Sequence, residues 1–227
     1  STGSNAGTIA SLTNNGGTFG NTGTITGAAA VNGGRLTTSG AINGGLTNAA
    51  TVVASGTIAG GITNDGTLSV VGNLTAAGGT VTQNAGSLLA VRAGTFSGIA
   101  TLNNSGTVTV AGGAGLTVTG DLINAAGGVV SVAAGGTVVD DLDNSGTVTN
   151  KGTYTAEVTN RSGGVVNNSG TWTGALDNLA GATAVNSGGW TGDAGNAGVL
   201  NNSGTWTGGV DNIGTLINSG TITGLVD

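Results

Sequence analysis

An asparagine recurs along almost the whole chain, and the interval from each one to the next is an even number. Successive side chains of a β-strand point to opposite faces, so an even interval returns each residue to the same face one turn later. An α-helix, with about 3.6 residues per turn, does not keep such a pattern. The spacing predicts a ribbon that coils and stacks on itself. The recurring asparagines are Asn14, Asn32, Asn48, Asn64, Asn84, Asn104, Asn124, Asn144, Asn160, Asn178, Asn196 and Asn212.

Odd and even positions carry different kinds of side chain from Leu36 onward. Nine of the ten acidic and three of the four basic residues are odd, the exceptions being Asp140 and Arg92. The large aromatic residues are even: Phe96, Tyr154, Trp172, Trp190 and Trp206. Even positions are therefore expected to face a core and odd positions to face water.

Two places depart from this alternation. Arg92 has inward parity, which is costly for an unpaired charge, so we expect a bulge near Ser87–Leu89 to turn it outward. Before Leu36 the phase is confused, since Phe19 and Ile25 are odd, and an irregular first turn is expected there.

The fold class expected from these patterns is all-β, a parallel β-helix (β-solenoid) of roughly 12–13 coils with 16–20 residues each, forming a rod on the order of 60 Å long. The 49 glycines suit sharp corners, and the lack of proline suits a backbone whose N–H groups all join the ladder between coils. We expect one domain over 1–227, with irregular first coils in 1–35, wider coils in 36–143 and tighter coils in 144–227.

Composition excludes several classes of function. Without cysteine or histidine there is no disulfide, no Ser-His-Asp triad and no thiolate or imidazole metal ligand. A net charge of -6 with only four basic residues argues against nucleic-acid binding. No apolar run approaches the length of a membrane span, and the residues after Ser1 do not form a signal peptide. We expect no enzyme activity, no catalytic or metal-binding residue, no cofactor and no membrane insertion by this segment.

An aromatic column and an asparagine ladder are the expected structural elements of the interior. The rings of Tyr154, Trp172, Trp190 and Trp206 each follow an asparagine by four residues, so they should stack on successive coils and fill the core. An exposed platform for a glycan is the alternative. The side-chain amides of the structural ladder should bond to one another from coil to coil. This ladder comprises Asn144, Asn160, Asn178, Asn196 and Asn212.

Threonines flank the aromatic column on both sides and have outward parity. They would form two files on one flat face, about 7 Å apart. The regular grid resembles the Thr-x-Thr face of ice-binding solenoids, although threonine also suits any exposed strand. The candidate outward face comprises Thr153, Thr155, Thr171, Thr173, Thr205, Thr207, Thr221 and Thr223.

The acidic residues offer two weaker alternatives. A file of Asp143, Asp177 and Asp211 could bind calcium, but Thr159 and Gly195 interrupt it in the intervening coils. The cluster of Asp140, Asp141 and Asp143 could supply a glycosidase acid and nucleophile, as in a polysaccharide-active β-helix enzyme. No His, Lys or Arg accompanies the cluster closely, so solvated acids flanking turns are expected instead.

The repeat unit is similar to the passenger repeats of bacterial autotransporters and of filamentous-haemagglutinin-like exoproteins. The residues that carry the resemblance are Asn168–Gly174 and Asn202–Gly208, with the sequence Asn-Ser-Gly-Thr-Trp-Thr-Gly, and the Gly-Thr-Val-Thr segments Gly106–Thr109 and Gly146–Thr149. The resemblance implies a right-handed parallel β-helix, export across the outer membrane, and roles in adhesion, aggregation or biofilm.

The leading hypothesis is thus a non-catalytic stalk or adhesive segment, secreted or at the bacterial cell surface. The implied partners are a host or bacterial surface, another copy of the chain, or a glycan. No cap-like segment closes the repeat near Thr223–Asp227, which is expected either of a piece of a longer chain or of a fibre subunit that stacks end to end.

Overall fold

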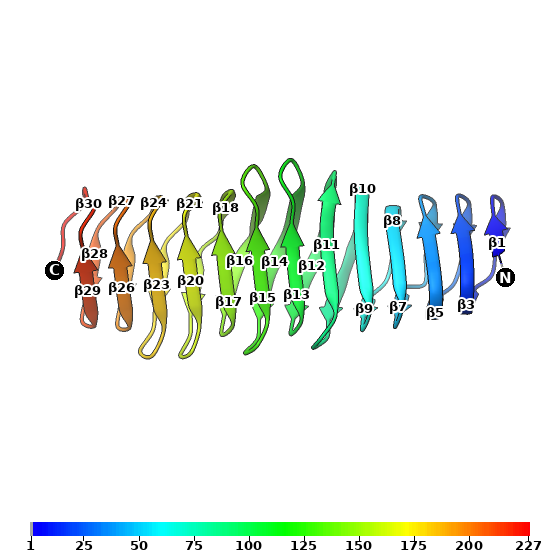
Figure 1. Cartoon of the computed structure of the whole chain (residues 1–227), viewed down its shortest axis with the longest axis horizontal. Helices are drawn as coiled ribbons and strands as arrows, with labels where there is room; N and C mark the ends of the chain where they lie inside the picture. Colours follow the sequence, from blue (N-terminus) through cyan, green and yellow to red (C-terminus); the bar gives the residue numbers. More distant parts are fainter. Residues whose placement is uncertain (1) are drawn as a thin grey trace.

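The computed structural model describes residues 2–227, and these residues form thirty β-strands and no helix. All thirty strands belong to one sheet. The chain winds about twelve times around an elongated body, with its two ends at opposite ends of the rod (Figure 1). Each coil pairs in parallel with the coil before it, as Thr171↔Thr153 and Thr173↔Thr155 illustrate. The predicted all-β solenoid is confirmed.

The strands, in chain order, are β1 (Thr2–Asn5), β2 (Thr8–Ile9), β3 (Leu12–Asn21), β4 (Thr24–Ile25), β5 (Ala29–Thr38), β6 (Ala41–Ile42), β7 (Leu46–Asn48), β8 (Thr51–Ile58), β9 (Ile62–Asn64), β10 (Thr67–Gln83), β11 (Leu88–Ala93), β12 (Thr95–Asn104), β13 (Thr107–Val110), β14 (Gly115–Asn124), β15 (Val129–Val132), β16 (Thr137–Asn144), β17 (Thr147–Asn150), β18 (Thr153–Thr155), β19 (Val158–Asn160), β20 (Val165–Asn168), β21 (Thr171–Thr173), β22 (Leu176–Asn178), β23 (Thr183–Asn186), β24 (Gly189–Thr191), β25 (Ala194–Asn196), β26 (Val199–Asn202), β27 (Thr205–Thr207), β28 (Val210–Asn212), β29 (Thr215–Asn218) and β30 (Thr221–Ile222).

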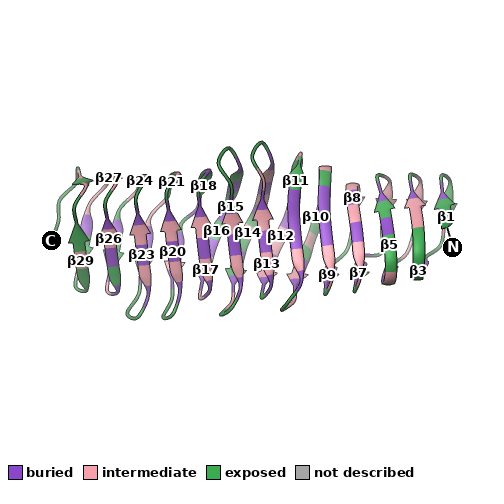
Figure 2. Cartoon of the chain, in the orientation of Figure 1, coloured by how far each residue is buried: buried purple, intermediate pink, exposed green. Residues whose placement is uncertain are grey.

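Each coil of the C-terminal half has three short strands, and their side chains alternate between core and solvent. In β27, Trp206 is fully buried while Thr205 and Thr207 are exposed. Buried stretches recur on the strands between the two ends of the rod, whereas the end strands β1 and β29 are mostly exposed (Figure 2). Because the inward residues of every coil touch those of the next, burial of apolar surface accumulates along the whole length of the rod.

The length of chain in each coil changes along the rod. Leu36, Val52 and Leu68 lie above one another at equal steps along the sequence. The step becomes longer between Leu68 and Leu89, and it returns to its first length between Val138 and Tyr154. The wide section therefore begins near Leu68, and the boundary expected at residue 36 lies too early.

The expectation that every step is even was wrong in two places. Asn14 pairs with Val31 rather than Asn32, so this column advances by an odd step. Asn64 pairs with Gln83 rather than Asn84, which is again an odd step. In the second case the corner within the odd step has left-handed backbone at Ala77 (φ 48°) and Gly78 (φ 77°). The parity of buried residues inverts after this corner, where Val81 and Gln83 are buried.

Arg92 is exposed, but the bulge expected near Ser87–Leu89 lies at Arg92 itself. Val70 pairs with Val91 and Val71 with Ala93, so Arg92 is left out of the ladder. The inverted parity of the preceding strand already points this side chain to solvent, where its Nε donates to Ser69 Oγ at 3.4 Å. The early coils also carry register shifts, on both sides of Asn15.

Candidate functional site

The aromatic column lies inside the rod. Tyr154, Trp172, Trp190 and Trp206 expose at most 1% of their surface. Their ring planes are nearly parallel, with centroid separations of 4.1 Å for Tyr154–Trp172 and 4.7 Å for each following pair. The interior position removes the alternative of an exposed glycan platform made by these rings. Sheet geometry sets the spacing, because the strands that carry the rings are hydrogen-bonded neighbours.

Each ring also has a polar partner in the preceding coil. The Nε1 groups of Trp172, Trp190 and Trp206 donate to backbone carbonyls of that coil at 3.2, 3.0 and 2.9 Å. Tyr154 begins the stack and differs, because its hydroxyl donates to Asp140 Oδ2 at 2.9 Å. The Asp140 carboxyl group is therefore the hydrogen-bond acceptor for the first ring of the stack, whereas a backbone carbonyl is the acceptor for each later ring.

The structural ladder forms a continuous chain of amide hydrogen bonds. Each Nδ2 donates to the Oδ1 of the next coil at 2.7–2.9 Å from Asn144 to Asn212. The same Nδ2 donates to a backbone carbonyl of the next coil, as Asn178 does to Val199 O at 3.0 Å. Bonds of the same kind join Asn48 to Asn64 and Asn64 to Gln83, which takes the rung that was expected of Asn84. The chain that leads into Asn144 begins at Asn104 and passes through Asn124.

A second amide ladder precedes the aromatic residues by four positions. Its bonds measure 2.8–2.9 Å and join Asn150, Asn168, Asn186, Asn202 and Asn218. Two columns of amides thus flank the core, buried except at their last rungs Asn212 and Asn218, and both hold successive coils in one register. These contacts satisfy polar groups that burial would otherwise leave unpaired.

The outward residues of β18, β21, β24, β27 and β30, with Thr223 after the last strand, make up the threonine face. All eight threonines expected on it are exposed. One file runs through Thr155, Thr173, Thr191 and Thr207 without interruption. Gly189 interrupts the other file between Thr171 and Thr205.

The threonine face continues toward the N-terminus, which sequence reasoning missed. Thr137 pairs with Thr153 and extends one file by a coil. In the other file Val139 pairs with Thr155, and Thr117 pairs with Val139 one coil earlier. The signal was hidden because the step along the sequence is longer from Thr117 to Val139 than from Val139 to Thr155, so a search at constant spacing loses the column.

Eight of the ten acidic residues share one side of the rod, which we call the acidic face. The outward positions of its strands form a column of Asp143, Thr159, Asp177, Gly195 and Asp211. The column breaks at Thr159 and Gly195. The acids of this face are Asp121, Asp141, Asp143, Glu157, Asp177, Asp193, Asp211 and Asp227.

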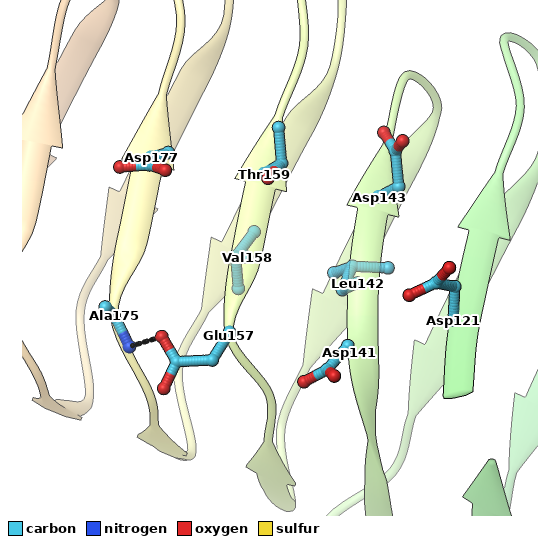
Figure 3. A pocket seen from close by; sticks show the side chains of 9 residues that line it. All are labelled: Asp121, Asp141, Leu142, Asp143, Glu157, Val158, Thr159, Ala175 and Asp177. Carbon is cyan, nitrogen blue, oxygen red and sulfur yellow. Dashed lines mark hydrogen bonds between the residues drawn. The ribbon is translucent and has the colours of Figure 1, made fainter. Parts of the chain in front are cut away.

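A shallow hollow of about 230 Å³ lies on the acidic face, with Asp121, Asp141, Asp143, Glu157 and Asp177 around it (Figure 3). The Glu157 carboxylate accepts from the Ala175 N–H at 3.1 Å. Arg161, at the turn that follows β19, pairs with Asp143 through an Nη2–Oδ2 contact of 2.6 Å. Hydrogen bonding to Asp143 raises the pKa of the Arg161 guanidinium above its ordinary value.

Asp140 is buried, so the expectation of a solvated acid was wrong for this member of the cluster. It exposes 6% of its surface, whereas Asp141 is exposed and Asp143 half-buried. Desolvation by burial is the main reason that the pKa of Asp140 is raised to about 8; the Tyr154 hydrogen bond lowers this pKa and the charge of Asp141 raises it. Burial, with the nearby Asp140 carboxyl, holds the pKa of Tyr154 well above its ordinary value.

Over residues 2–227, the structure brings together no group of three or more His, Cys, Asp or Glu side chains that could hold a metal ion. The same part of the chain has no helix long and apolar enough to cross a membrane. What the arrangement offers chemically is a set of repeated surfaces, each presenting one kind of group at the spacing of β-strands.

No family model and no curated protein matches the chain. Among solved structures, it is similar to a TibC-catalyzed hyper-glycosylated TibA fragment, at 21% identity and a TM-score of 0.40. That alignment covers 100% of this chain and 97% of the other. Identity and TM-score are both too low for this likeness to bear on activity.

Proposed function

We propose that the chain is a non-catalytic, rod-like segment of a secreted or surface-exposed bacterial protein, acting as a stalk or adhesive surface in adhesion, aggregation or biofilm formation. The observation that carries the proposal is the repetition of one exposed group on one face, coil after coil. In the uninterrupted file, one threonine stands on each successive coil, at Thr155, Thr173, Thr191 and Thr207.

Repetition matters because many weak contacts at fixed spacing add up when one rigid body presents them together. The buried amide ladders and the ring stack supply that rigidity, since they tie each coil to the next through side chains as well as backbone. A host or bacterial surface, another copy of the chain or a glycan coat could each meet such a face.

Introducing charge on the threonine face tests the proposal. With the chain displayed on beads, we expect lysine at Thr155, Thr173 and Thr191 to abolish bead aggregation and attachment to bacterial cells. A control with lysine at Thr149 and Thr183, which point outward from β17 and β23 on another side of the rod, should keep both. Equal loss in both variants, or no adhesion by the unmodified chain, would contradict the proposal.

The non-catalytic part of the proposal has its own test. Asp141 is the exposed acid nearest to Asp143 along the chain, and both line the hollow of the acidic face. Incubation with plant and microbial polysaccharides should give no new reducing ends. Turnover that Asp141→Asn removes would show that this face is an active site.

Ice binding is the second candidate, favoured by the one-to-one register of the threonine files. Thr153 lies beside Thr171, and Thr155 beside Thr173, so hydroxyl and methyl groups recur in two directions on an exposed face. Thermal hysteresis and ice-crystal shaping at micromolar protein would support this candidate. Their absence in a sample that aggregates beads would leave the adhesive role alone.

A further inference from the structure

A third surface of the rod, distinct from the threonine face and the acidic face, is built by one strand from each of seven successive coils. These strands, β13, β15, β17, β20, β23, β26 and β29, lie side by side without a register shift (Figure 1). Each strand has two outward residues, so two columns of side chains follow the rod, and we call this surface the alternating face. Its first column comprises Thr107, Val129, Thr147, Val165, Thr183, Val199 and Thr215, and its second column comprises Thr109, Ser131, Thr149, Asn167, Val185, Asn201 and Ile217.

The side chains of the alternating face are short and uncharged. In the first column threonine and valine, which have nearly the same shape, follow one another strictly from coil to coil. Neighbouring coils shield these residues, and all are half-buried except Val199, Thr215 and Ile217, which are exposed. The surface is therefore even in height, which is the shape that a second sheet can pack against.

The charged residues lie outside the alternating face. Arg92 precedes the first of its strands, and Lys151 and Arg161 lie in turns that border it. A second copy of the chain carries the same net charge of -6, so contact between two acidic faces would be repulsive. Contact between two alternating faces keeps the acids of both copies on other sides of the rods, where salt screens charges more than about 8 Å apart.

The alternating face is large enough for a specific interface. Seven coils at about 4.8 Å and strands that span about 20 Å with their corner residues give about 700 Å² per copy. A pair of copies would thus bury about 1,400 Å², within the range of about 1,200–2,000 Å² that is common for specific complexes.

The repeat of the alternating face matches that of an identical rod. A partner whose groups recur at another spacing would fall out of step with the coils after a few repeats. An identical rod in the same direction places each coil opposite its own counterpart, so any irregularity in coil spacing is matched along the whole face.

We propose that two copies of the chain pack side by side, in the same direction, through their alternating faces. The two-fold axis of such a pair runs along the rods, and the first column of each copy lies opposite the second column of the other. Valine methyl groups would be removed from water there, while threonine hydroxyls and asparagine amides would pair across the interface. The pairing goes beyond the adhesive role proposed above, because it uses another face and leaves the threonine faces of both copies free.

Sedimentation of the full chain in solution tests the pairing. We expect the average mass to rise toward that of a dimer between about 1 and 100 µM. Lysine at Thr149 and Thr183 should raise the dissociation constant about tenfold or more, because each lysine would be desolvated without an opposite charge. Lysine at Thr155, Thr173 and Thr191 should change it less than about twofold. Bead adhesion is expected to respond to these two variants in the reverse way, so either proposal can fail without the other.

A mixing experiment separates loss of pairing from loss of folding. The lysine variant at Thr149 and Thr183 should form a mixed dimer with a variant that has glutamate at the same two positions, because opposite charges then meet in the same coils. Each of these variants alone should stay largely monomeric at the same concentration. Failure of the mixture to associate would contradict an interface at these residues.

An introduced cysteine tests the direction of the pair, since the chain has none of its own. Thr109→Cys lies near one end of the alternating face, and same-direction pairing should place the two sulfur atoms within about 10 Å, in reach of a short bis-maleimide. Opposite directions would separate them by about 29 Å along the rod. No cross-link, a chain that stays monomeric, or a dimer that the lysine variant leaves intact would overturn the proposal. A monomer whose adsorption to ice is lost in the lysine variant would also overturn it and assign the face to ice.

Discussion

Replacing Trp172 and Trp190 with leucine, singly and together, measures how much two stacked rings stabilise each other beyond the surface that each buries. Their centroids are 4.7 Å apart, their planes differ by 5°, and neither exposes more than 1% of its surface. Leucine keeps the interior apolar while removing the ring and its N–H. We expect each single substitution to cost about 2–4 kcal/mol, somewhat less than truncation to alanine.

The ring–ring contribution is the coupling energy of the double-mutant cycle. Parallel aromatic pairs contribute about 0.5–1.5 kcal/mol beyond burial, so the double variant should cost about 1 kcal/mol less than the sum of the singles. Trp172 and Trp206 provide a matched control, because Trp190 separates them and no direct stacking contact exists to lose. Their coupling should stay below about 0.5 kcal/mol.

Urea unfolding followed by far-UV circular dichroism gives the free energies, because loss of the β-sheet gives an unfolding transition in every variant, whatever the amplitude of its folded signal. Equal slopes against urea across the variants are required, because a solenoid can unfold in parts. If the neighbouring pair couples no more strongly than Trp172 and Trp206, the stack stabilises the rod only by filling space, and the reasoning about ring contacts fails.

Three further predictions concern the ladder, the corners and the buried acid. Asn178→Leu removes one acceptor of the Asn160 Nδ2 and the amide donor to both Asn196 Oδ1 and Val199 O, and we expect it to lower the free energy of unfolding in urea by about 2–4 kcal/mol. Gly192→Ala would put a Cβ 2.2 Å from a backbone oxygen at φ 144°, so its melting temperature should fall far more than that of Gly7→Ala, whose Cβ meets nothing within 4 Å. Burial raises the pKa of Asp140 in the folded state from 3.8 to about 8, so the folded state holds this proton more tightly than the unfolded state does. The protonated carboxyl therefore contributes most to the free energy of unfolding below about pH 4, and this contribution is lost as the pH rises to about 8. Asp140→Asn should flatten that part of the stability profile, and a slope that persists in the variant would refute the assignment.

The periodic units were enough to predict which residues enter the core of the C-terminal half. Between Asn150 and Asn218 the coils keep even steps, so alternation along each strand places the tryptophans inside and the flanking threonines outside. The same rule failed at Asn32 and Asn84, because odd steps place the preceding residues, Val31 and Gln83, on those rungs of the ladder.

Alternation alone separates inside from outside, and it does so because a strand has only two faces. It does not say which side of the rod an outward residue joins, since that depends on the length of chain spent at every corner. The gathering of eight acids on one side and the extension of the threonine face to Thr117 both follow from corner lengths. The sequence by itself determined that the chain coils and which residues of the regular coils face inward. The tertiary structure decided which outward residues of successive coils lie side by side, because register is set by contacts between residues that lie far apart along the chain.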